Sequence, residues 1–116
     1  MAEVLQNALQ CLAEVTNSLL GLVLQGKNDE FLADSVLYLE LISIIAIAWQ
    51  WLKQAITAVT ALANQPSERD INFYKGKIYT CRYFFDYELP KIEGLALRLK
   101  SSSKVTVEMP TACFED

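Results

Sequence analysis

The sequence predicts an all-α protein, an antiparallel bundle of three long helices followed by an extended C-terminal tail. Only four Gly and three Pro occur in 116 residues, so long stretches contain nothing that disfavours a helix. Apolar residues recur at three- and four-residue spacing in three segments, which is the period of an amphipathic helix. We therefore expect a single domain, residues 1–116, with helices at about 3–25, 29–64 and 68–100 and a tail at 101–116.

The central helix, at about 29–64, contains no Gly or Pro, and Asp29 and Glu30 place negative charge in its first turn, where the helix dipole favours it. Its middle is apolar on nearly every face, which is typical of a helix enclosed by neighbours. The alternative is a membrane span, which needs about 20 predominantly apolar residues. Because Glu40 and Lys53 bracket a shorter apolar run, we expect the core helix of a soluble bundle.

The two outer helices are bounded by recognisable signals. Gly26 suits the position just after the first helix, and the short connection that follows favours antiparallel neighbours. Ser67 and Asp70 approximate a capping box at the start of the third helix. Pro90 lies inside the third apolar pattern, but the spacing continues through it in phase. We expect one helix, kinked near Pro90.

Charge and cysteine content exclude several classes of function. The formal net charge is −4, and an acidic domain without a basic cluster supplies little of the phosphate neutralisation that binds nucleic acid. The first residues lack the features of a signal peptide. The three cysteines, Cys11, Cys81 and Cys113, are widely spaced and form no CxxC pair, which argues against a disulfide framework or a zinc site. We expect buried free thiols in a cytoplasmic protein that binds neither nucleic acid nor a membrane.

The residue types of most catalytic sites are missing. The chain has no histidine, which removes Ser–His–Asp and Cys–His nucleophile activation and the commonest transition-metal ligand. No Gly-rich loop follows a strand, so no phosphate-binding motif is present. Glu40 lies in apolar surroundings that can raise a carboxyl pKa, but a solvent-facing residue or a partner for Lys77 or Arg82 is the favoured interpretation. We predict no catalytic, cofactor-binding or metal-binding residues.

Aromatic residues are dense on the third helix and occupy more than one of its faces, so some of them point away from the local core. Such residues are common at protein interfaces. Trp49 and Trp51 lie about 200° apart around the central helix. One of them therefore packs inside, and the other packs against the third helix or a partner. We predict Trp51, Tyr83 and Phe84 as interface residues.

Several short segments resemble the C-terminal extension of a subgroup of bacterial acyl-CoA dehydrogenases that includes enzymes similar to 3-methylmercaptopropionyl-CoA dehydrogenase. The resemblance covers nearly the whole chain and rests on spaced aromatic and apolar positions. Gly76 and Cys81 depart from it, since a small helix former such as Ala is usual there. The segments that carry it are Tyr38-Leu39-Glu40-Leu41, Trp49 and Trp51, Phe73-Tyr74 with Lys77, Arg82-Tyr83-Phe84-Phe85, Leu89-Pro90 and Met109-Pro110-Thr111-Ala112-Cys113-Phe114.

The resemblance implies a function for the chain as part of a larger enzyme. Such dehydrogenases carry FAD and oxidise an acyl-CoA thioester at its α and β carbons, and their flavin site and catalytic carboxylate belong to a main body upstream of the extension. It implies a non-catalytic module, without a cofactor of its own, that serves docking or oligomerisation. The expected partners are the dehydrogenase body and, for the isolated chain, a second copy in a homodimer.

A second hypothesis comes from a different class of function. The chain is then a free-standing helical bundle that binds an apolar ligand or a partner helix. A pocket lined by Ile45, Trp49 and Phe84 favours this hypothesis over the first. An enzyme in its own right is the least favoured reading, because the catalytic groups are missing.

Overall fold

The computed structural model describes residues 1–101, 103 and 105–114, and the regular elements among them are all helical. The expected all-α class is confirmed. The α-helices are α1 (Ala2–Leu24), α2 (Asn28–Ala33), α3 (Ser35–Ala63), α4 (Glu68–Tyr83), α5 (Ile92–Lys100) and α6 (Val105–Glu108). A π-helical segment η1 (Phe84–Glu88) and a 3-10 turn η2 (Leu89–Lys91) join α4 to α5, and a second 3-10 turn η3 (Thr111–Phe114) follows α6.

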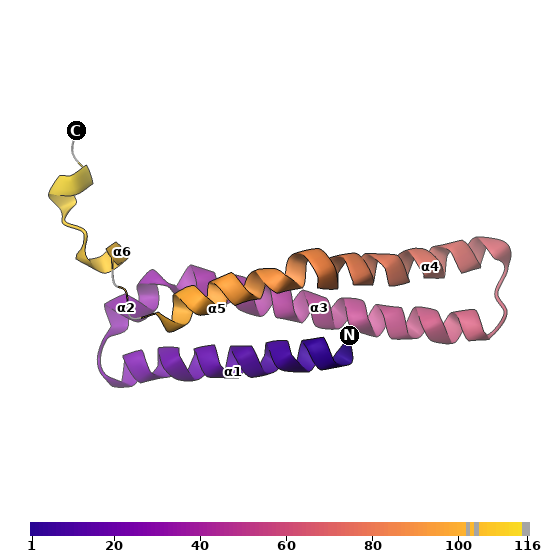
Figure 1. Cartoon of the computed structure of the whole chain (residues 1–116), viewed down its shortest axis with the longest axis horizontal. Coiled ribbons are helices and arrows are strands. Elements are labelled where there is room, and N and C mark those ends of the chain that lie inside the picture. Colours follow the sequence, from indigo (N-terminus) through magenta and orange to yellow (C-terminus); the bar gives the residue numbers. More distant parts are fainter. Residues whose placement is uncertain (102, 104, 115–116) are drawn as a thin grey trace.

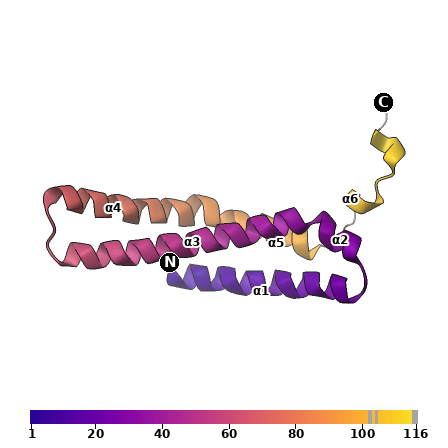
Figure 2. The same ribbon diagram turned by 180° about the vertical axis from the view of Figure 1, so that it is seen from behind.

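The chain runs along the long axis in α1, returns in α3 and runs back again through α4 and α5 (Figure 1). The view from behind shows the same arrangement (Figure 2). α1 begins beside the middle of α3, where the Cys81 thiol of α4 donates a hydrogen bond to Met1 Sδ at 3.5 Å. Beyond that point, α3 and α4 continue as a two-helix hairpin. The radius of gyration is 19.6 Å, against about 13 Å for a compact domain of this length.

The core lies where α1, α3 and the α4–α5 rod run side by side. Its most deeply buried side chains are Val15, Leu41 and Cys81, one from each of these three elements. A polar contact ties two of the helices, because the hydroxyls of Thr16 on α1 and Tyr38 on α3 lie 2.6 Å apart. No polar or charged side chain of the described residues is buried, so packing rather than internal ion pairs holds the bundle together.

The predicted helix at 29–64 is divided into α2 and α3 at Asp34, which is a correction to the sequence-based expectation. Asp34 adopts φ −105° and ψ 5°, outside the helical region, and its N–H bonds to the carbonyl of Phe31 at 3.3 Å. Asp favours such local turns over a helix interior. Its carboxylate accepts a hydrogen bond from Arg98 Nη2 at 3.0 Å, which fixes the turn against α5.

The rod formed by α4, η1, η2 and α5 passes through Pro90 without leaving the helical region of backbone conformation. Cys81, Phe85, Leu89 and Ile92 are all buried, at intervals of four, four and three residues. Two successive intervals of four contain one residue more than the regular three-and-four alternation. A π-helical turn inserts one residue into a helix, so η1 keeps the apolar residues on both sides of Pro90 facing the core.

The tail differs from its predicted extended form. Val105–Glu108 and Thr111–Phe114 each form a short helical turn, and α6 packs against α2. Residues 109–114 project from the end of the bundle (Figure 1). Phe114 is 73% exposed, so this segment adds little to the core.

The structure predicts that Pro90→Ala keeps the fold and changes stability by less than about 1 kcal/mol. The substitution restores a backbone donor, but the spacing of Phe85 and Leu89 still requires the π-helical turn. Thermal unfolding of the variant and of the native chain measures the difference. A loss of several kcal/mol would show that Pro90 itself, rather than the packing, holds the segment in place.

Candidate interaction surface

An open apolar groove of about 370 Å³ runs between α1 and α3. It is lined by Leu5, Leu9 and Leu12 of α1 and by Ile42, Ile45, Ala46 and Trp49 of α3. Apart from the adjacent Ile45 and Ala46, the residues from each helix are spaced three, four or seven apart, which places them on one side of that helix. We call this feature the α1–α3 groove.

Trp49 forms one end of the α1–α3 groove and remains 52% exposed. Lys53 Nζ lies 4.7 Å from the centre of its ring, in a cation–π contact one helical turn away. Trp51 points to the other side of α3, where it is half-buried against the core and Lys77 Nζ of α4 lies 5.7 Å from its ring. The two tryptophans therefore lie on different sides of α3, as expected from their angular separation of about 200° around the helix.

The three predicted interface residues have different surroundings. Trp51 and Phe84 are half-buried and pack against the core, while Tyr83 is 55% exposed. The Tyr83 ring stacks on that of Tyr87, with 4.8 Å between ring centres. Their role in an interface remains a prediction.

Other exposed apolar residues continue the α1–α3 groove along α3. Leu39 is 63% exposed and Ile56 is 57% exposed. Together with Ile42, Ala46, Trp49 and Lys53 they follow an alternating three-and-four spacing, which is the spacing of a coiled-coil seam. We call these six residues the outer stripe of α3. The sequence predicted that the middle of this helix is enclosed by its neighbours. Its apolar pattern extends around most faces, so it does not reveal which face of α3 the other helices leave exposed.

α3 is long and apolar enough, by length and composition, to cross a membrane, which the sequence-based analysis did not expect. Core helices of soluble proteins meet the same criterion but are mostly buried, whereas 17% of the apolar stretch of α3 is buried. Lys53 lies close to the centre of α3, and an ionisable residue there costs about 2.5–3.5 kcal/mol on insertion. The exposed apolar surface of α3 is therefore better suited to contact with protein than to a transmembrane position.

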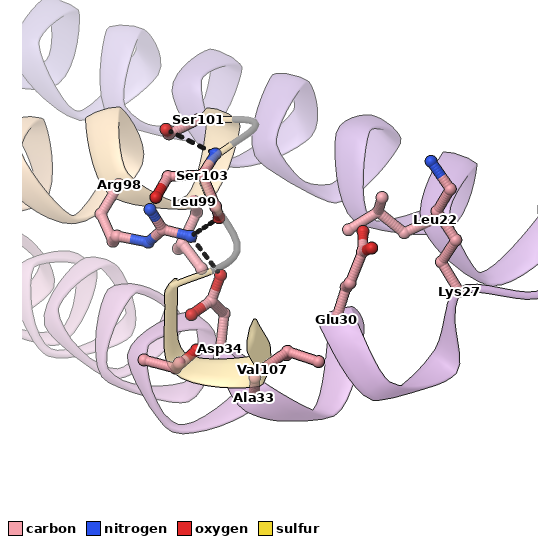
Figure 3. A pocket seen from close by; sticks show the side chains of 11 residues that line it. Leu22, Lys27, Glu30, Ala33, Asp34, Arg98, Leu99, Ser101, Ser103 and Val107 are labelled. Carbon is pink, nitrogen blue, oxygen red and sulfur yellow. Dashed lines mark hydrogen bonds and ion pairs between the residues drawn. The ribbon is translucent and has the colours of Figure 1, made fainter. Parts of the chain in front are cut away.

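A smaller cavity of about 100 Å³ lies where α2, α5 and the tail meet (Figure 3). The Arg98 guanidinium points at Asp34, and its Nη2 also donates to the carbonyl of Ser103 at 2.8 Å. Glu30 points into the same cavity from α2. Sites for small ligands are usually larger, about 300–1,000 Å³. We interpret this cluster as a structural junction that holds the tail to the bundle.

The carboxylates and cysteines show no arrangement for catalysis within the described part of the chain. Glu40 is exposed, as in the favoured interpretation of the sequence. No group of three or more His, Cys, Asp or Glu that could hold a metal ion occurs among those residues. The three cysteines are free, but only Cys81 is buried; Cys11 is half-buried and Cys113 is exposed. The expectation of three buried thiols is therefore wrong, because Cys113 falls in the projecting tail.

Burial raises the pKa of the Cys81 thiol above its ordinary value, and the nearby N-terminal ammonium of Met1 opposes this only in part. Since the thiolate is the reactive form, we predict that Cys81 reacts with a thiol reagent far more slowly than Cys113. The Cys81 reaction should also require a higher pH. Mass spectrometry after brief labelling gives the order of modification. Equal rates at Cys81 and Cys113 would contradict the packing of α1 on α4.

A double-mutant cycle on Arg98 and Asp34 should give a coupling energy of about 0.5–1 kcal/mol in urea unfolding, since the pair is only partly buried. The Lys100–Glu14 pair is the matched control. It is longer, 3.5 Å against 3.0 Å, and both its side chains are more exposed, so its coupling should be close to zero. Equal coupling in the two pairs would show that the junction is not a specific anchor.

A family model described as acetyl-CoA dehydrogenase C-terminal like matches residues 1–110, which is nearly the whole chain. No curated protein matches the sequence.

Proposed function

Because the chain belongs to the acetyl-CoA dehydrogenase C-terminal-like family, we propose that it is the non-catalytic helical module of an FAD-dependent acyl-CoA dehydrogenase that acts in fatty acid metabolism. In this proposal the module docks on the dehydrogenase body or joins subunits, and in isolation it forms a homodimer in the cytoplasm. The subgroup similar to 3-methylmercaptopropionyl-CoA dehydrogenase is the proposed parent type. The family match over residues 1–110 is the observation that carries the proposal.

The amount of exposed surface supports a role in protein contact. The chain exposes 8193 Å², whereas a compact monomer of 13.1 kDa exposes about 6,400 Å². The projecting tail and the long hairpin contribute to the difference of about 1,800 Å². A standard protein interface covers about 800 Å² on each partner, which is less than half of the excess surface of this chain.

The residue types of this chain support the proposal that the parent's main body, and not this module, binds FAD and acyl-CoA. FAD and CoA both carry phosphate groups, which proteins usually bind with backbone N–H groups of Gly-rich loops or with clustered basic residues. The sequence has no such loop, and its exposed α1–α3 groove is apolar. In our proposal the parent's main body therefore holds FAD and the acyl-CoA, and this module supplies contact surface.

The second candidate, a free-standing bundle that binds an apolar ligand or a partner helix, is favoured by one observation. The α1–α3 groove contains Ile45 and Trp49, two of the three residues that the sequence-based analysis proposed for such a pocket. Phe84 does not line it. Ligand sites normally include a few polar groups that orient the ligand, and the groove lining is almost entirely apolar. A helix fits such a groove better than a small molecule does.

We predict that the isolated chain binds neither FAD nor acyl-CoA and has no dehydrogenase activity. A purified sample should show no flavin absorbance and should not reduce an electron-accepting dye in the presence of acyl-CoA. A complete acyl-CoA dehydrogenase measured alongside is the positive control. A yellow protein with activity would contradict the proposal.

Docking is tested by a separate experiment, in which the isolated chain is titrated calorimetrically into an acyl-CoA dehydrogenase that lacks its own C-terminal module. If no dehydrogenase body from the proposed subgroup binds the chain, that result counts against docking.

A further inference from the structure

We propose that the outer stripe of α3 is a self-complementary interface, through which two copies of this chain pair with their α3 helices antiparallel. The inference deepens the proposed function, and it rests on that function because it assumes that the module makes protein contacts. It assigns the contact to a different face from the one that Trp51, Tyr83 and Phe84 suggested.

The outer stripe is distinct from the stripe of α3 that forms the core. Leu41, Ile45 and Ala48 are at most 3% exposed and pack inside the bundle. Leu39, Trp49 and Ile56 are 63%, 52% and 57% exposed, and nothing in the packing of the described residues accounts for three large apolar side chains in this line. The stripe follows the three-and-four spacing that antiparallel helix pairs use for their seam.

The spacing of the outer stripe is symmetric about its centre, which is what a two-fold contact requires. When two copies pair antiparallel about the midpoint between Ala46 and Trp49, each Ala46 meets Trp49 of the second copy. Leu39 meets Ile56 in the same register. A large ring then lies over the smallest side chain of the stripe, and a leucine lies against an isoleucine. Such large–small pairing gives close packing without overlap.

Charge does not oppose this pairing. Lys53 is the only charged residue of the outer stripe, and in the proposed register it meets Ile42 of the second copy. Its stem can cover that apolar side chain while its ammonium stays in water. At about 1.5 Å rise per residue, the two copies of Lys53 lie roughly 16 Å apart along the helices, and salt screens repulsion beyond about 8 Å.

The form and the apolar lining of the α1–α3 groove favour a second copy as the occupant. The second copy's α3 lies along the groove, where it contacts Leu9 of α1 as well as the outer stripe, and the symmetry repeats this contact on the other side. The chain as a whole exposes about 1,800 Å² more than a compact monomer, part of it on the tail and the hairpin, and a stable pair needs about 800 Å² from each copy. A helix seated in an apolar groove is a common form of recognition.

The test uses the complete 116-residue chain and its oligomeric state by analytical ultracentrifugation. We expect a dimer at low micromolar concentration. Leu39→Glu and Ile56→Lys should each weaken the dimer by about tenfold or more, because each buries a charge against an apolar residue. Ile47→Glu is the matched control: Ile47 is 46% exposed on the same helix but lies about 100° around the helix from Ala46 and farther from Trp49, so this variant should remain a dimer. Circular dichroism checks that all variants stay helical.

The double variant Leu39→Glu/Ile56→Lys tests the register itself. In the proposed pairing each new Glu faces a new Lys of the second copy, so the double variant should recover most of the dimer that each single variant loses. A native chain that stays monomeric overturns the inference, and so does a double variant weaker than both singles. If the monomeric chain binds a dehydrogenase body, and Leu39→Glu abolishes that binding, the proposed function stands and the α1–α3 groove is the docking site for the body. If the monomeric chain sediments with neutral phosphatidylcholine vesicles instead, the outer stripe of α3 is a membrane-binding surface.

Discussion

The structure depends on the unequal covering of α3. The rod of α4, η1, η2 and α5 runs beside α3 along nearly all of its length, while α1 covers only the half nearer to α2 (Figure 1). The core side chains therefore concentrate where all three segments meet, and Val15, Leu41 and Cys81 are fully buried there. Elsewhere α3 keeps apolar residues at the surface. Fully burying a Leu, Ile or aromatic side chain contributes about 1.5–3 kcal/mol, so covering the exposed parts of Leu39, Trp49 and Ile56 contributes roughly 3–5 kcal/mol.

The rest of the bundle adjusts to this central helix. Asp34 ends α2 and starts α3 through a turn that Arg98 holds in place from α5. The π-helical turn at Phe84–Glu88 absorbs the extra residue between Cys81 and Leu89, which keeps the rod on the core side of α3 through Pro90. Both features are local departures from a regular α-helix, and both preserve the packing of apolar side chains. They act as structural joints rather than as sites of chemistry.

Much of the fold follows from local sequence signals, and the exceptions have physical reasons. The three-and-four spacing and the turn residues around Gly26 and Pro66 predicted helices and their approximate ends. The break at Asp34 was missed because it depends on Arg98, a residue 64 positions away in the sequence. The groove was only partly anticipated. Ile45 and Trp49 were named for such a pocket, but Leu9 and Ile42 were not, since the face of α3 that stays exposed depends on where α1 begins. The exposure of Cys113 was missed because the sequence pattern of the tail does not show that this segment projects from the bundle.

The central claim, that the outer stripe of α3 is an interface, can be measured through Trp49 itself. In a Trp51→Phe variant, Trp49 is the only tryptophan, and its fluorescence reports whether its ring is in contact with water. Our account predicts that its emission shifts to shorter wavelength as the protein concentration rises through the micromolar range, with one transition that matches dimer formation by ultracentrifugation. Emission typical of an exposed ring at every concentration, unchanged when a dehydrogenase body is added, would contradict the claim.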